Sequence, residues 1–177
     1  MSTRWRRRAA ALSAILMAVL FTAPPMPAVA DPSTNAADLQ RQIDAQLAAH
    51  PGGKQLNASQ ISYANGAFII TMARPAGTAP NPDCPAGWFC FYEYTGFGYP
   101  RGQLSSCGWQ DLAWWGWNDR VESVHSNQTR GKVTFLNHGL SPTHSDDVAL
   151  FSITPGQARA DVSPYRNIAD HVYRTSC

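Results

Sequence analysis

The sequence predicts an all-β domain behind a short helical segment, and its composition and turn residues support this fold class. Of its 177 residues, 44% are apolar, 15% charged and 11% aromatic, which excludes a collagen, a coiled coil and a wholly disordered chain. Gly and Pro number 13 each beside six Trp, so short strands joined by many turns are favoured over long surface helices.

The first 30 residues have the features of a secretion signal. A basic head, RWRRR (residues 4–8), precedes an apolar stretch from Ala9 to Phe21. The small residues Ala28 and Ala30 suit signal peptidase, so the mature chain is expected to begin at Asp31. The ordinary secretory route is favoured over the twin-arginine route, because alanines rather than bulky apolar residues follow the arginines.

Loss of this signal changes the charge of the protein. The whole chain carries a net charge of +2, whereas the part after residue 30, without the four arginines of the signal, carries −2. This balance argues against nucleic-acid binding, which needs clustered cations. The apolar stretch is also short for a spanning helix of ~20 residues. We therefore expect a secreted, extracellular monomer with no nucleic-acid partner and no membrane association after signal removal.

The four cysteines all lie in the expected mature part: Cys84, Cys90, Cys107 and Cys177. An even number of cysteines in an oxidising compartment favours two disulfides over a metal site or a catalytic thiol. Three pairings are possible. Because Cys177 is the last residue, it suggests a bridge that pins the C-terminus to the fold, with Cys107 as its expected partner.

Two elements are predicted before residue 73. The segment Asn35 to His50 is predicted as a helix, which Pro51 and the two glycines after it end. Its apolar residues recur every four positions and form one stripe: Leu39, Ile43 and Leu47. The segment Ile61 to Met72 is predicted as a β-hairpin that turns at Asn65-Gly66. These elements are too small for a core of their own, so they dock on the C-terminal part of the chain, bind a partner or form a removable leader.

A linker and a main domain complete the chain. Residues 73–83, ARPAGTAPNPD, have no apolar periodicity and separate the N-terminal segment, residues 31–72, from a domain of residues 84–177. Three stretches of that domain are predicted as strands: Trp88 to Tyr94, Lys132 to Leu136 and Val148 to Ile153.

The main domain contains an internal repeat. Residues 116–125 can be aligned with residues 164–173 at a separation of 48 positions, so that Asp119 matches Asn167 and Glu122 matches Asp170. A repeat of this kind predicts two copies of one supersecondary unit.

Four motifs carry a resemblance to a known family: CPAGWFCFYE (84–93), GFG (96–98), WQDL (109–112) and WNDR (117–120). They resemble secreted actinobacterial proteins of peptidase inhibitor family I36, over residues 84 to about 140. The resemblance implies a βγ-crystallin-like sandwich of two Greek-key motifs with four strands each, here with an N-terminal helix and β-hairpin extension. In such motifs an aromatic stacks on a folded hairpin and a Gly supplies a backbone angle that other residues avoid. Tyr92, Phe97 and Gly98 are the expected counterparts.

The resemblance also implies a disulfide pairing and an activity. Its CPAG-x-x-C opening implies a Cys84–Cys90 bridge, which leaves Cys107 for Cys177. The implied activity is non-enzymatic inhibition, in which a rigid loop binds the cleft of an extracellular proteinase, with metalloproteinases as known targets. Inhibitory members hold a second short Cys-to-Cys loop where this sequence has only Cys177, so no reactive bond can be assigned. The exposed rim is expected at Thr95 to Gly102 or at Asn137 to Asp147.

Calcium binding is an alternative function. Crystallin motifs that bind Ca²⁺ carry two Asn/Asp, two free positions, a Ser/Thr and a Ser, because Ca²⁺ requires oxygen ligands. The two copies here are NDRVES (118–123) and RNIADH (166–171). The candidate ligands are Asn118, Asp119, Glu122, Ser123, Asn167 and Asp170. A structural role for both stretches is favoured, and no cofactor is expected to be required.

Glycan binding and catalysis have less support. Four tryptophans form a candidate exposed aromatic patch for sugar rings, although core packing is favoured: Trp109, Trp114, Trp115 and Trp117. No GxSxG, HExxH or paired-carboxylate motif is present, so no catalytic residue is expected. His138 and His144 are interpreted as loop residues with no metal between them.

Overall fold

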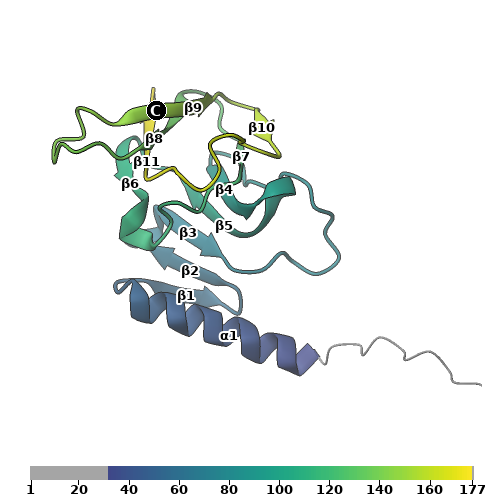
Figure 1. Ribbon diagram of the computed structural model, residues 1–177. Coiled ribbons are helices and arrows are strands. Elements are labelled where there is room, and N and C mark those ends of the chain that lie inside the picture. The colour runs from purple at the N-terminus through teal and green to yellow at the C-terminus, as the bar shows by residue number, and fades with distance from the viewer. Residues whose placement is uncertain (1–31, 177) are drawn as a thin grey trace, which may run out of the picture.

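The computed structural model describes residues 32–176, which are mostly β with one helix at the N-terminal side (Figure 1). The elements in chain order are α1 Pro32–Ala49, β1 Lys54–Asn57, β2 Gln60–Tyr63, η1 Ala64–Gly66, β3 Phe68–Thr71, β4 Phe89–Tyr94, η2 Thr95–Phe97, β5 Gly98–Leu104, β6 Gly108–Asp111, η3 Leu112–Trp115, β7 Ser123–Ser126, β8 Lys132–Asn137, β9 Val148–Ile153, β10 Ala158–Arg159 and β11 His171–Thr175. The signal and the cleavage site predicted at its end lie outside the described residues. Among the residues that are described, no helix is long and apolar enough to cross a membrane.

The strands form two antiparallel sheets. The first has the order β1-β2-β3-β5-β4-β7-β10, and the second has the order β6-β11-β8-β9. Within the main domain, β4 to β7 make one motif and β8 to β11 make the other. In each motif the first strand pairs with the second and the fourth, while the third strand joins the opposite sheet. The expected pair of four-strand motifs is therefore confirmed, and the exchanged strands tie the two motifs together.

The internal repeat has a structural counterpart in the loops before β7 and β11. Asp119 donates its backbone N–H to the carbonyl of Ala169 at 3.0 Å, and Asn167 donates its own to the carbonyl of Val121 at 3.1 Å. The two donors have φ angles of 57° and 56°. Asn and Asp adopt this left-handed conformation more readily than most other residues. Equivalent residues of the two copies thus make reciprocal contacts about an approximate twofold axis.

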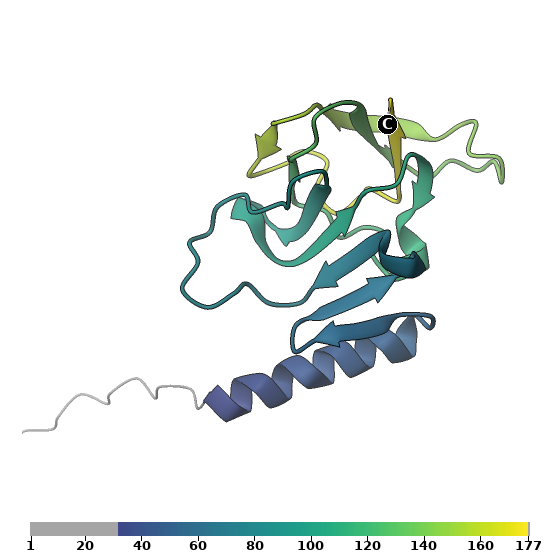
Figure 2. The same ribbon diagram turned by 180° about the vertical axis from the view of Figure 1, so that it is seen from behind.

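The N-terminal elements extend the first sheet. β3 pairs with β5 along its whole length, and α1 lies beside β1 and β2, away from the second sheet (Figures 1 and 2). The predicted stripe of α1 faces the sheet: Ile43 is fully buried in the main core, and Leu39 and Leu47 pack against it. The segment is therefore a structural part of the sandwich.

The predicted hairpin is present, but its turn differs from the expectation. Tyr63 pairs with Phe68, so four residues connect the strands, and a single 3₁₀ turn spans Ala64–Gly66. Ala64 and Asn65 have φ angles of 48° and 55°. The Tyr63 hydroxyl, at the end of β2, donates to the carbonyl of His50, just after α1.

The folded hairpin after β4 corrects a second expectation. Gly98 has a φ of −73°, and the left-handed angles belong to Gly96 and Phe97. Gly98 is needed for space instead, because a Cβ there would lie 2.7 Å from Cβ of Tyr94. The expected aromatic contact is present: the rings of Tyr92 and Phe97 meet edge to face at 5.5 Å.

One predicted disulfide is confirmed. Cys84 and Cys90 are bonded, with their Cα atoms 5.6 Å apart, beside the rings of Tyr92 and Phe97. Cys107 is also disulfide-bonded. Its expected partner, Cys177, lies outside the described residues, so that pairing stays a prediction.

Candidate functional site

The loop between β8 and β9 projects beyond both sheets (Figures 1 and 2). We call residues 138–147 the β8–β9 loop. Leu140 in this loop is 98% exposed, the highest value among the exposed large apolar residues described. Single exposed apolar side chains are common on protein surfaces, so Leu140 is of interest because of the backbone that presents it.

Two neighbouring aspartates hold the loop in shape. The carboxylate of Asp146 accepts the backbone N–H groups of Leu140 at 2.8 Å and of Ser141 at 3.0 Å. These hydrogen bonds from Ser141 and Leu140 hold the pKa of Asp146 below its usual value. Gly139 donates its N–H to Asp147 at 3.1 Å. The backbone on either side of the exposed Leu140 is therefore fixed by its own loop.

Gly139 is required where the two ends of the loop approach each other. A Cβ at this position would lie 2.3 Å from Oδ1 and 2.7 Å from the backbone oxygen of Asp146. Any larger residue would push the two sides apart. The close approach explains how a loop of ten residues stays compact.

The base of the loop is a buried Asp–His pair. Nδ1 of His171, from β11, lies 2.6 Å from Oδ2 of Asp147, and the two side chains are only 3% and 2% exposed. The indole N–H of Trp109 donates to the same oxygen at 3.3 Å. Burial raises the pKa of Asp147, but the hydrogen bonds from the Gly139 N–H and from His171 lower it by more than burial raises it. The net pKa of Asp147 is therefore below its usual value.

Two more histidines stand beside this pair. The ring centroids of His138 and His144 lie 5.2 and 5.0 Å from that of His171, and 6.3 Å from each other. One nitrogen of each histidine and one oxygen of Asp147 lie within 4.8 Å of one another. We call these four residues the histidine cluster.

Sequence reasoning missed the histidine cluster because β-pairing assembles it. β11 pairs with β8 so that His171 lies opposite Leu136, two residues before His138. His138, His144 and Asp147 form an H-x₅-H-x₂-D run in one loop, which is the signal that could have been noticed. The third histidine, 24 residues after Asp147, could not be placed without the register.

The predicted calcium ligands separate into two unlike groups. Asn118 and Asp170 line one cavity of about 390 Å³ together with Asp111. Asp119 lies nearby and is exposed. Partial loss of solvent around its carboxyl and the negative charge of Asp170 raise the pKa of Asp119. Asp111 and Asp170 each keep one carboxylate oxygen for this space, since the other accepts a backbone N–H, from Ala113 at 2.7 Å and from His138 at 2.9 Å. His138 and His171 line the same cavity.

The second group is already satisfied by protein contacts. Glu122 accepts the amide of Asn167 at 2.7 Å and the backbone N–H of Thr95 at 3.1 Å. The Ser123 hydroxyl is buried, donates to the carbonyl of Tyr94 at 2.7 Å and accepts from Phe97. The structure does not bring Ser123 to a free ligand site, because its hydroxyl supports the folded hairpin.

The four tryptophans do not form one exposed patch. Trp115 is 6% exposed and Trp117 is fully buried, whereas Trp114 is 55% exposed. Trp109 is half-buried and stacks on His144 with 3.8 Å between ring centroids. Trp114 meets Trp109 and Trp115 edge to face, with ring centroids 5.8 and 5.7 Å away. Burial of Trp115 and Trp117 means that the four rings do not make one platform.

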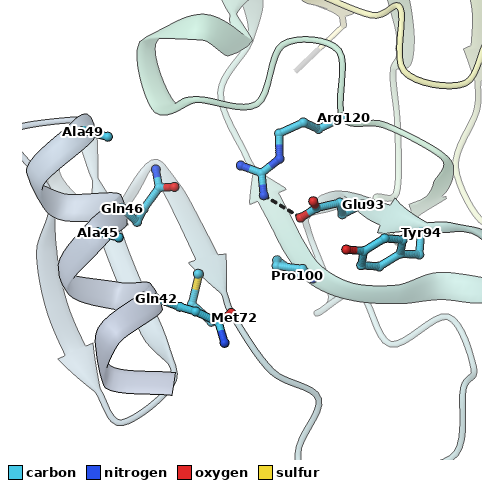
Figure 3. A pocket seen from close by; sticks show the side chains of 9 residues that line it. All are labelled: Gln42, Ala45, Gln46, Ala49, Met72, Glu93, Tyr94, Pro100 and Arg120. Carbon is cyan, nitrogen blue, oxygen red and sulfur yellow. Dashed lines mark hydrogen bonds and ion pairs between the residues drawn. The ribbon is translucent and has the colours of Figure 1, made fainter. Parts of the chain in front are cut away.

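The other predicted rim, Thr95 to Gly102, is mostly occupied by the fold. Phe97, Arg101 and Gly102 are buried, and most of the segment belongs to β5. A groove of about 380 Å³ lies between α1 and the β4–β5 hairpin (Figure 3). Its two charged lining residues, Glu93 and Arg120, pair with each other at 2.5 Å, so they provide no free charge for catalysis.

Comparisons with known proteins give one family and one fold likeness. None of the curated proteins compared with the chain matches it. A solved structure described as "Evolution of the eye lens beta-gamma-crystallin domain fold" aligns with a TM-score of 0.41 and 14% identity, over 57% of this chain and 95% of that chain. The model of peptidase inhibitor family I36, a family of inhibitors and not of enzymes, matches the segment that runs from the linker to the end of β8. The similarity to peptidase inhibitor family I36 therefore covers residues 77–137.

Proposed function

We propose that this protein is a secreted proteinase inhibitor of extracellular metalloproteinases, and that the β8–β9 loop enters the proteinase cleft. The observation that carries the proposal is the full exposure of Leu140 on a loop fixed by Asp146 and Asp147. A loop already ordered in its bound shape loses little entropy on binding. An exposed apolar side chain can then fill a specificity pocket of the enzyme.

The loop bracing also fits the absence of a second short Cys-to-Cys loop in this part of the sequence. Side-chain carboxylates that accept consecutive backbone N–H groups restrict the same backbone that a local disulfide would restrict. The Cys84–Cys90 bridge and the domain match to an inhibitor family support secretion and a proteinase partner.

The test is a titration of the purified protein against extracellular metallo, serine and cysteine proteinases. We expect stoichiometric inhibition of a metalloproteinase. Leu140→Glu should weaken inhibition by about 100-fold, the usual effect of removing an anchoring side chain. Leu56→Glu is the matched control, because Leu56 is a 49% exposed leucine on β1, and inhibition should not change.

Both variants should keep the thermal midpoint of the parent, since both side chains are exposed. Inhibition of no proteinase class would contradict the proposed function. Equal loss from the two variants, or none from Leu140→Glu, would place the contact surface outside the β8–β9 loop.

Calcium stabilisation is a second candidate, supported on one side of the repeat only. Asp111, Asn118 and Asp170 line one space together with His138 and His171, and the charge of Asp170 acts on Asp119. A hard cation on the aspartate side of this space would meet oxygen ligands and relieve the repulsion. Around Glu122 the residues do not fit a cation, because N–H donors from Asn167 and Thr95 occupy its carboxylate.

A further inference from the structure

We propose that the histidine cluster is a binding site for Zn²⁺ or a similar divalent transition metal. The ligands are imidazole nitrogens of His138, His144 and His171, with Asp147 fixing the orientation of His171. This inference does not rest on the inhibitory function, because it concerns only the chemistry of four side chains.

The ring positions agree with a three-histidine site. With Zn–N bonds of about 2.0 Å in tetrahedral geometry, neighbouring imidazole centroids lie about 5 Å apart. The centroids here are 5.0, 5.2 and 6.3 Å apart. Their planes cross at 61–81°, so the rings meet edge to face and do not stack on one another. A small rotation of His138, the exposed member, would bring the longest distance into range.

The hydrogen bonds of Asp147 assign a tautomer to His171. Oδ2 of Asp147 lies 2.6 Å from Nδ1 of His171, so Nδ1 carries the proton and Nε2 presents its lone pair. Oδ1 of Asp147 accepts the Gly139 N–H, and Oδ2 also accepts from Trp109. A carboxylate that fixes the tautomer of a ligating histidine is the usual outer partner in zinc sites.

His144 provides an independent sign of a missing ligand. Its Nδ1 is buried and has no hydrogen-bond partner. A buried polar atom without a partner costs roughly 1–3 kcal/mol, so such atoms need an explanation. Trp109 stacks on the same ring and fixes its plane. A metal ion bound by this nitrogen would supply the partner that the described protein atoms do not provide.

Metal binding would have a structural consequence for the β8–β9 loop. His138 and His144 lie at the two sides of the segment that carries Leu140, while His171 belongs to β11. An ion shared by all three would fasten the loop to the second sheet, as a short disulfide would. Imidazole ligands select Zn²⁺, Ni²⁺ or Cu²⁺ over Ca²⁺, which requires oxygen.

The test is isothermal titration of the metal-free full-length secreted protein with ZnCl₂, and with CaCl₂ in parallel. We expect one Zn²⁺ per chain, and His138→Ala and His144→Ala should each weaken this binding by about 100-fold. His50→Ala is the matched control, since His50 lies outside the cluster, and it should leave Zn²⁺ binding unchanged.

A readout independent of affinity is hydrogen exchange at the Leu140 and Ser141 amides, which Zn²⁺ should slow in the parent but not in His138→Ala. No stoichiometric Zn²⁺ binding, or the same loss from His50→Ala as from His138→Ala, would overturn the proposal. Proteinase inhibition that persists without metal would leave this test unaffected, so the two proposals fail separately.

Discussion

Asp83, at the end of the linker, stabilises the point where the linker joins the main domain. The hydroxyls of Tyr92 and Tyr99 donate to its two carboxylate oxygens, and the Arg101 guanidinium lies 3.2 Å away. Arg101 is 7% exposed, and a buried cation is stable only beside an anionic partner. Burial raises the pKa of Asp83. The hydrogen bond from Tyr99 and the charge of Arg101 together lower it by more than burial raises it, so the net pKa is below its usual value.

Replacing this carboxylate should destabilise the protein in a pH-dependent manner. We expect Asp83→Asn to lower the free energy of unfolding by about 2–3 kcal/mol at pH 7, because Arg101 loses its charged partner. A carboxyl whose pKa is lowered in the folded state stabilises fully above its unfolded pKa of about 3.9 and loses this effect as pH falls further. Urea unfolding should therefore show the difference between parent and variant narrowing below about pH 4.

Asp44→Asn is the control for that measurement. Asp44 lies on the exposed side of α1 and accepts a hydrogen bond from the side chain of Gln40, four residues away. Its replacement should change the free energy of unfolding by less than about 0.5 kcal/mol at any pH. A difference for Asp83→Asn that stays constant down to pH 2.5 would show that its charge is not the cause.

At the scale of elements, the N-terminal helix and hairpin are attached to the main domain in two ways: by strand pairing at the edge of the first sheet and by the covalent linker. β3 pairs with β5, and Phe68 and Ile70 enter the main core. The linker itself is exposed from Pro75 to Pro82. Covalent continuity through the linker is therefore not what keeps these elements in place.

Limited proteolysis should separate these two contributions. We expect a broad-specificity proteinase to cut first between Ala73 and Asp83, where the backbone is most exposed. The two fragments should then co-elute in gel filtration, because the β3–β5 ladder and the buried stripe of α1 survive the cut. First cleavage inside α1, or separation of the fragments without denaturant, would contradict the boundary or the docking.

Local patterns predicted the individual elements better than their connections. Leu39, Ile43 and Leu47 predicted α1 because its buried side follows helical spacing. The strands β4, β8 and β9 were predictable because they are rich in β-branched and aromatic residues. β10 has only two residues, both exposed, and its pairing with β7 depends on the other motif. No local pattern contains that information.

At the scale of the whole molecule, the exchanged strands explain why the functional residues were only partly predictable. Repeat matching paired Asp119 with Asn167 correctly, since both make the reciprocal contacts between the motifs. The histidine cluster combines a loop of the second motif with β11 and with Trp109 of the first motif. Its assembly depends on strand register, which a single sequence does not reveal.

The approximate twofold symmetry of the fold does not extend to the charges of its loops. The position of Asn118 in the first copy is taken by Arg166 in the second, where its guanidinium pairs with Asp161 at 2.6 Å. The carboxylate of Glu122 in the first copy accepts hydrogen bonds from Asn167 and Thr95, whereas the carboxylates of Asp119 and Asp170 repel each other. Two equivalent places in the fold thus differ in their attraction for a cation.

This asymmetry predicts one Ca²⁺ per chain and not two. With Ca²⁺ at a hundredfold excess over its Kd, the apparent stability should rise by about 2.7 kcal/mol, which raises the thermal midpoint by about 5–10 °C. Asp119→Gly removes the carboxylate but still allows the left-handed φ of 57°, so it should abolish the Ca²⁺-dependent rise. Asn167→Gly is the same change at the equivalent position, and it should keep the rise. Titration of two ions, or a rise that survives in Asp119→Gly, would show that the second loop binds despite Arg166, whereas no rise in the parent would assign both loops a structural role.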